Sequence, residues 1–76
     1  MAKKIVSEHT LTRGEGESMT FLLYKHTDPT YTIEERRQAH DGSGVEISEF
    51  GPDDERAHAA LATYLQIATD ELDWRR

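Results

Sequence analysis

The chain has 76 residues, no cysteine and a formal net charge of −6 at pH 7. This length predicts a single domain, 1–76, near the lower limit for independent folding and without disulfides to stabilise it. The lysines and arginines are dispersed, which argues against nucleic-acid binding and against an anionic membrane surface. No stretch resembles a signal peptide or a membrane span, so we expect a cytoplasmic protein.

Residues 3–13 predict the first strand. Ile5, Val6 and Leu11 are its apolar residues, and the threonines around Leu11 have high strand propensity. The glycines of the segment 14–17 permit the backbone conformations that a tight hairpin needs. We therefore expect an antiparallel connection to the next strand.

Residues 18–26 form the strongest predicted strand, because both of its faces are apolar. Leu22 and Tyr24 share one face. The other face carries Met19, Phe21 and Leu23. A strand of this kind is usually central, or is covered by the core on one face and contacted by a partner on the other. Leu22 and Tyr24 are therefore candidate interface residues.

The segment 31–40, which follows a break at 28–30, is open to two interpretations. Its apolar residues recur at every second position, which favours a strand. Residues 34–39 have high helix propensity, and Thr32 and Glu35 have the spacing of a capping box. A helix here would have no apolar stripe to pack, so we predict a strand, with the order ββαβα as the alternative.

Residues 41–44 predict a hairpin turn of open length into a strand at 45–50. A helix is predicted over 52–73, because Pro52 and three acidic residues suit its first turn. Its apolar stripe at helical spacing is Ala57, Leu61, Tyr64, Leu65, Ala68 and Leu72. The predicted fold is α+β: a four-stranded antiparallel meander with one C-terminal helix on one face, ββββα.

The predicted helix carries no formal charge over residues 57–69, apart from a possible charge on its histidine. This pattern has two explanations: an alanine-rich helix of good intrinsic propensity, or a second contact surface, most simply with another copy of the chain. Trp74 could anchor the helix or lie in an interface. The candidate interface residues on the helix are His58, Ala62, Gln66 and Ile67.

No motif predicts catalysis, a metal or a cofactor. Ser43 lies between two glycines, but the Gly-x-Ser-x-Gly elbow of a nucleophile is missing, so we interpret this serine as part of a hairpin loop. No two histidines have the i, i+4 spacing of helical metal ligands. Glu55 and His58 match only one half of a di-iron helix motif.

These observations predict a small non-enzymatic protein-interaction module that self-associates, most simply as a homodimer. Two alternatives stay open. One is an acidic inhibitor that mimics nucleic acid and blocks a basic groove of its partner, which requires carboxylates clustered on one face. The other is a single-stranded nucleic-acid binder that uses aromatic residues on a sheet.

Overall fold

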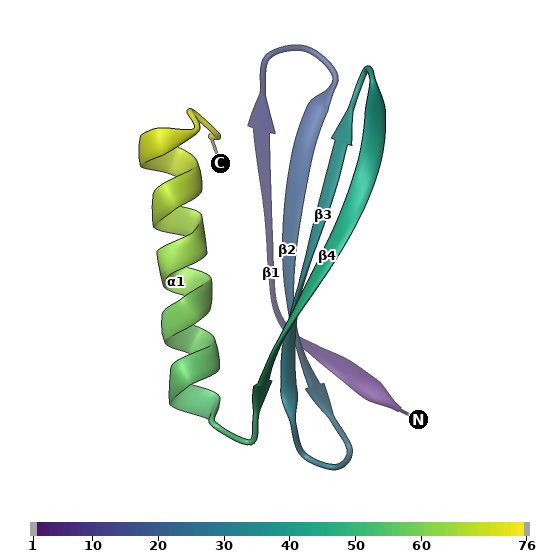
Figure 1. The fold of residues 1–76 in the computed structure, drawn as a ribbon, viewed down its shortest axis with the longest axis vertical. Helices are drawn as coiled ribbons and strands as arrows, with labels where there is room; N and C mark the ends of the chain where they lie inside the picture. Colours follow the sequence, from purple (N-terminus) through teal and green to yellow (C-terminus); the bar gives the residue numbers. More distant parts are fainter. Residues whose placement is uncertain (1, 76) are drawn as a thin grey trace.

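In the computed structural model, residues 2–75 form a four-stranded antiparallel sheet followed by one helix (Figure 1). The strands are adjacent in the order β1-β2-β3-β4. The elements are β1 (Lys3–Arg13), β2 (Glu17–His26), β3 (Tyr31–Ala39), β4 (Gly42–Gly51) and α1 (Asp54–Glu71). The predicted α+β meander with a C-terminal helix is therefore confirmed.

The strand β3 forms where propensity favoured a helix, because its packing outweighs that propensity. Ile33 is 2% exposed and Tyr31 is 8% exposed, and both side chains enter the core. The strand pairs with β2 on one side and with β4 on the other, which satisfies its backbone groups in both directions. A helix over the same residues would have placed charged side chains against the sheet.

The hairpin between β3 and β4 is tighter than the predicted turn at 41–44. Ala39 pairs directly with Gly42, so the loop consists of His40 and Asp41. Ser43, which we interpreted as a loop residue, instead lies in β4 opposite Gln38. The glycines of this segment are compatible with an extended strand, and pairing with β3 extends β4 toward the turn.

The helix begins two residues later than predicted, because an aspartate caps it. Asp53 has an extended backbone, and its side chain accepts a hydrogen bond of 3.0 Å from the main-chain N–H of Arg56. Pro52 therefore precedes the cap and lies outside the helix. Among the described residues, no helix combines the length and the apolar character needed to cross a membrane.

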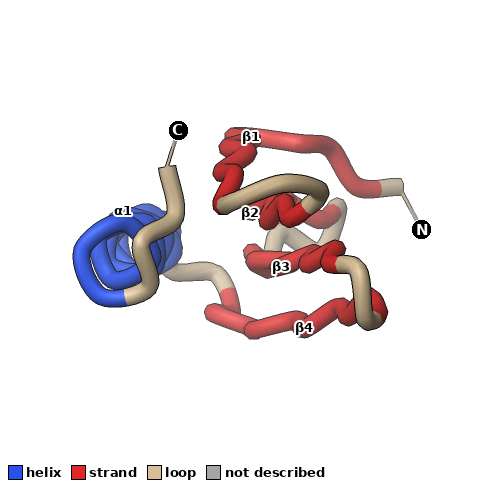
Figure 2. Tube along the Cα trace, turned by 90° about the horizontal axis from the view of Figure 1, so that it is seen from above, coloured by secondary structure: helices blue, strands red, loops and turns tan. Residues whose placement is uncertain are grey.

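The core lies between α1 and one face of the sheet, which we call the inner face. Viewed from above, α1 lies on one side of the sheet, whose edges are β1 and β4 (Figure 2). The backbone of α1 comes closest to β2, β3 and β4, so β1 receives the least cover from the helix. The buried core residues are Leu11, Met19, Phe21, Leu23, Tyr31, Ile33, Ala57, Leu61, Leu65, Ala68 and Trp74.

The chain after α1 folds back and attaches to β1. The main-chain N–H and C=O groups of Arg75 and Thr12 bond to each other at 2.8 and 2.7 Å. Trp74, the residue before this attachment, is 1% exposed. The guanidinium of Arg13 lies 4.4 Å from the centre of the Trp74 ring. Trp74 therefore anchors the end of the helix. Its burial leaves little surface for a partner, and its place in an interface stays an untested prediction.

Candidate interaction surface

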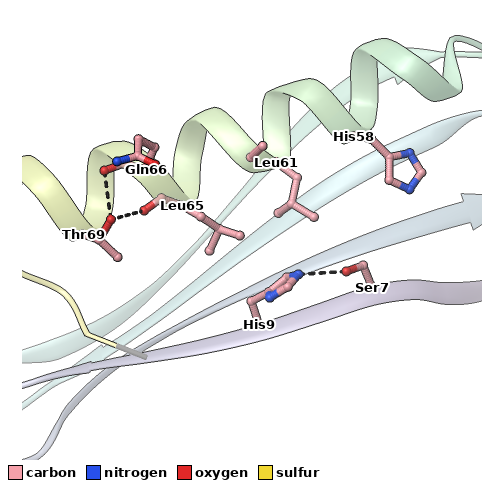
Figure 3. A pocket seen from close by; sticks show the side chains of 8 residues that line it. Ser7, His9, His58, Leu61, Leu65, Gln66 and Thr69 are labelled. Atoms are coloured by element: carbon pink, nitrogen blue, oxygen red, sulfur yellow. Dashed lines mark hydrogen bonds between the residues drawn. The ribbon is translucent and has the colours of Figure 1, made fainter.

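An open groove of ≈ 530 Å³ runs between β1 and α1 (Figure 3). It exists because the helix packs over the other three strands and leaves the inner face of β1 beside an open space. The groove is lined by Ser7 and His9 from β1 and by His58, Leu61, Ala62, Leu65, Gln66 and Thr69 from α1.

The floor of the groove is apolar. Leu61 and Leu65 lie one helical turn apart and belong to the core stripe of α1, so both point from the helix toward the sheet (Figure 3). Each is 4% exposed, which means that the groove reaches the edge of the core. A partner that fills the groove therefore covers the boundary between core and solvent.

The wall formed by β1 is short and polar. Ser7 and His9 are two positions apart on one strand, so their side chains share the inner face (Figure 3). The Ser7 hydroxyl and Nε2 of His9 are 2.9 Å apart and share a hydrogen bond. Beyond Ser7 the strand has a bulge between Ile5 and Ser7, so the alternation of side chains changes there.

The wall formed by α1 satisfies its polar groups within the helix. His58 lies with Nδ1 2.7 Å from a carboxylate oxygen of Asp54, at the i, i+4 spacing. Gln66 donates to the carboxylate of Asp70, and the Thr69 hydroxyl donates to main-chain oxygens of the preceding turn. Because these groups already have partners, the wall favours packing over the specific binding of a polar ligand.

The chemistry of the groove does not favour a catalytic or metal site. A serine beside a histidine can be a nucleophile and its base, but among the described residues His9 makes no further side-chain hydrogen bond that would orient its ring. His58 lies on the opposite wall and is held by Asp54. Within residues 2–75, no three side chains of His, Asp or Glu lie close enough to hold a metal ion together.

The groove brings together three of the predicted interface residues: His58, Ala62 and Gln66. Ile67 lies away from the groove on another side of α1, where it is 42% exposed and adjoins Tyr64 and Leu72. The sequence prediction missed Ser7 and His9. The period-2 pattern of the sequence shows that both residues share a strand face with Leu11. It does not show where the helix lies across the sheet, and this position places both residues in the groove.

Leu22 and Tyr24 lie on the outer face of the sheet, opposite α1, as their alternation with the core residues of β2 requires. They are only 4% and 7% exposed. The ammonium group of Lys3 lies 4.2 Å from the centre of the Tyr24 ring, and Leu22 lies between Glu8 and Glu34 in the sheet register. Both side chains therefore expose little surface in a single chain, and their role in an interface stays a prediction.

The acidic residues occur on both faces of the sheet. Glu34 bonds to Arg36 at 2.5 Å on the outer face, and Glu35 lies 3.4 Å from Arg37 on the inner face. The Glu34 carboxylate raises the pKa of the Arg36 guanidinium through this hydrogen bond and through its charge. These ion pairs run along β3 and not across strands, and they mix basic and acidic groups on each face.

Comparisons with known proteins add no relative to this description. A scan against models of protein families matched none, and searches of the curated proteins and of the solved structures also returned no match.

Proposed function

We propose that the protein is a small non-enzymatic interaction module that self-associates through the groove between β1 and α1. In this homodimer, the helix surface that carries Ala62 packs against the same surface of a second copy. The observation that carries the proposal is the groove itself, whose exposed helix wall of His58, Ala62 and Gln66 borders the edge of the core and whose lining contains no Asp, Glu, Lys or Arg.

Charge restricts where a second copy can bind. Each chain has a net charge of −6, so two copies repel one another over most approaches. The lining itself carries no carboxylate, and the nearest ones, Asp54 and Asp70, are already paired with His58 and Gln66 at its border. Ala62 is small and allows two helices to approach closely.

The exposed area supports the same conclusion. The chain exposes 5196 Å², whereas a compact monomer of its mass exposes roughly 4,700 Å². A standard interface covers about 800 Å² of each partner. Association through the groove would cover part of this excess and shield the edge of a small core.

The two alternatives receive less support. A nucleic-acid mimic needs one acidic face, and the ion pairs Glu34–Arg36 and Glu35–Arg37 lie on opposite faces of the sheet. A single-stranded nucleic-acid binder needs accessible aromatic rings, and Tyr24 on the outer face is 7% exposed.

The proposal predicts the effect of a charge placed in the groove. A dimer with a dissociation constant of about 1 μM is largely formed at a chain concentration near 10 μM. At that concentration, sedimentation equilibrium should give a mass approaching twice the 8.7 kDa of one chain. Ala62→Arg should return the protein to the monomer mass, because each copy would bury an unpaired charge. The helix itself should persist, since arginine has high helix propensity.

Thr63→Arg is the matched control. Thr63 is the next residue on the exposed part of α1 and does not line the groove. This variant should sediment like the unmodified chain. A monomer mass for the unmodified chain, or equal masses for the two arginine variants, would contradict the proposal.

A further inference from the structure

The two edges of the sheet expose the same kind of apolar side chain. At the β1 edge, Ile5 is 53% exposed and Val6 is 39% exposed. At the β4 edge, Val45 is 59% exposed and Ile47 is 62% exposed. Within residues 2–75, no second layer covers the outer face, where Ile5, Val45 and Ile47 lie (Figure 2). The largest exposed apolar groups of the sheet are therefore concentrated at its two edges.

The same edges differ in charge. The β1 edge begins with Lys3 and Lys4, whereas β4 carries Glu46 and Glu49 and has no lysine or arginine between Gly42 and Gly51. Lysines on an edge strand usually deter pairing with other strands. Carboxylates on the opposing strand remove that penalty, so the two edges complement one another.

The main-chain groups of both edges are oriented for pairing. The N–H and C=O groups of Thr12 point away from β2, because they bond to Arg75. Main-chain direction alternates along a strand, so those of Glu8 and Thr10 point the same way. In an antiparallel sheet, two residues that face each other both direct their main-chain groups either toward each other or away from each other. Applied from β1 through β2 and β3 to β4, this rule directs the main-chain N–H and C=O groups of Val45 and Ile47 away from β3.

We propose that β1 of one copy pairs antiparallel with β4 of a second copy, with Ile5 beside Ile47 and Lys3 beside Glu49. The segment available on β1 runs from Lys3 to Thr10, since Arg75 already occupies Thr12. This contact continues the meander from one molecule into the next. It goes beyond the proposed homodimer, because it joins the sheet edges through main-chain pairing instead of packing one helix on another.

Pairing between unlike edges has a consequence for the assembly. Each copy that donates its β1 edge keeps its own β4 edge open, so the contact is head-to-tail and extends into a ring or a filament. Two β4 edges would instead bring Glu46 and Glu49 together with their own copies, which like-charge repulsion disfavours. The charges therefore select unlike edges.

The test uses Ala62→Arg as the parent chain, so that failure of the groove contact is measured separately. Light scattering after gel filtration gives the mass from about 10 μM to about 1 mM, the range of weak association. The parent chain should increase in mass with concentration. Reversing the charges of one edge, either as Lys3→Glu with Lys4→Glu or as Glu46→Lys with Glu49→Lys, should weaken this association by roughly tenfold or more.

An equal mixture of the two charge-reversed chains completes the test. In the mixture the acidic β1 edge of one chain meets the basic β4 edge of the other, and the remaining unmodified edges also match. The mixture should therefore regain the concentration-dependent mass of the parent. The proposal is overturned if the parent stays monomeric, if a reversed chain associates as the parent does, or if the mixture stays as weak as its components.

Discussion

Glu34 is the one buried acidic residue of the described chain, and its partner Arg36 is largely exposed. The carboxylate lies on the outer face, between Leu22 and Ile47 in the register, with only 10% of its side chain exposed. A charge in such a position depends on its partner, because removing the partner leaves it poorly solvated.

Arg36→Met should therefore lower the free energy of unfolding by clearly more than the control does, even though methionine keeps most of the apolar stem. Arg37→Met is the control, because Arg37 lies at a longer distance from its partner Glu35, whose side chain is more exposed than that of Glu34. Its effect should stay within about 0.5 kcal/mol. Urea unfolding of the two variants checks this, and equal losses would show that Glu34 does not depend on Arg36.

Asp28 shows how a loop residue contributes to the pH dependence of stability. The Thr30 hydroxyl donates to its carboxylate at 2.7 Å, which lowers the pKa of Asp28 below its usual 3.8, and the Thr30 main-chain N–H at 3.0 Å adds to the effect. A lowered pKa means that the folded state favours the ionised form. This stabilisation is present above pH 3.8 and is lost as the pH falls through the lower, folded-state pKa.

Thr30→Ala should raise the pKa of Asp28 toward its usual value, because the hydroxyl donor is lost while the main-chain donor remains. Thr30→Ser should keep the pKa low. The carboxyl carbon of Asp28 can be titrated by NMR in the three proteins. An unchanged titration in the alanine variant would exclude the hydroxyl as the main cause.

At the scale of elements, the two hairpin tips at one end of the sheet hold each other in place. His40, in the β3–β4 loop, hydrogen bonds through Nε2 to the main-chain oxygen of Glu15 in the β1–β2 turn at 2.6 Å. Gly16 lies directly beneath this ring. Its backbone has φ +77°, and a side-chain carbon there would lie 2.7 Å from the imidazole.

Gly16→Ala should destabilise the fold by about 1–3 kcal/mol, since the new methyl group strains the turn and displaces His40. Gly44→Ala is the matched control, because Gly44 has no neighbour within 4 Å of an added carbon and no left-handed backbone. It should be neutral or stabilising by up to about 1 kcal/mol. Thermal unfolding compares the two, and similar losses would contradict this account of the turn.

Periodicity and turn residues were sufficient to predict the order of elements. The period-2 face of residues 31–39 outweighed their helix propensity, because Ile33 has a place in the core. Boundaries were less predictable: β4 begins at Gly42 because pairing with β3 continues to the turn, and the helix begins after the cap of Asp53. Neither effect is visible without the neighbouring strand or the cap geometry.

The candidate site was predicted only on its helical side. Missing charges on α1 indicated Ala62 and Gln66, which line the groove. Ser7 and His9 could not be assigned to it, because the lateral position of α1 on the sheet is set by core packing between distant residues. The burial of Trp74 could not be predicted for the same reason, since it depends on Arg13 and on the return of the chain to β1.

At the scale of the whole molecule, we propose different kinds of association for the groove and for the sheet edges. The groove is uncharged and suits a closed, two-fold contact, in which one surface meets itself. The edges carry opposite charges and suit an open contact between unlike surfaces. Under these two proposals, a chain with few core residues would gain burial by assembly, as small domains without disulfides commonly do.

The most direct test of the groove contact is a search for NMR contacts between copies. A sample that mixes labelled and unlabelled chains reports only nuclear Overhauser effects that cross the interface. The account predicts such effects between the methyl group of Ala62 in one copy and the side chains of Leu65 and His9 in the other. Effects confined to other surfaces, in a sample that sediments as a dimer, would contradict it.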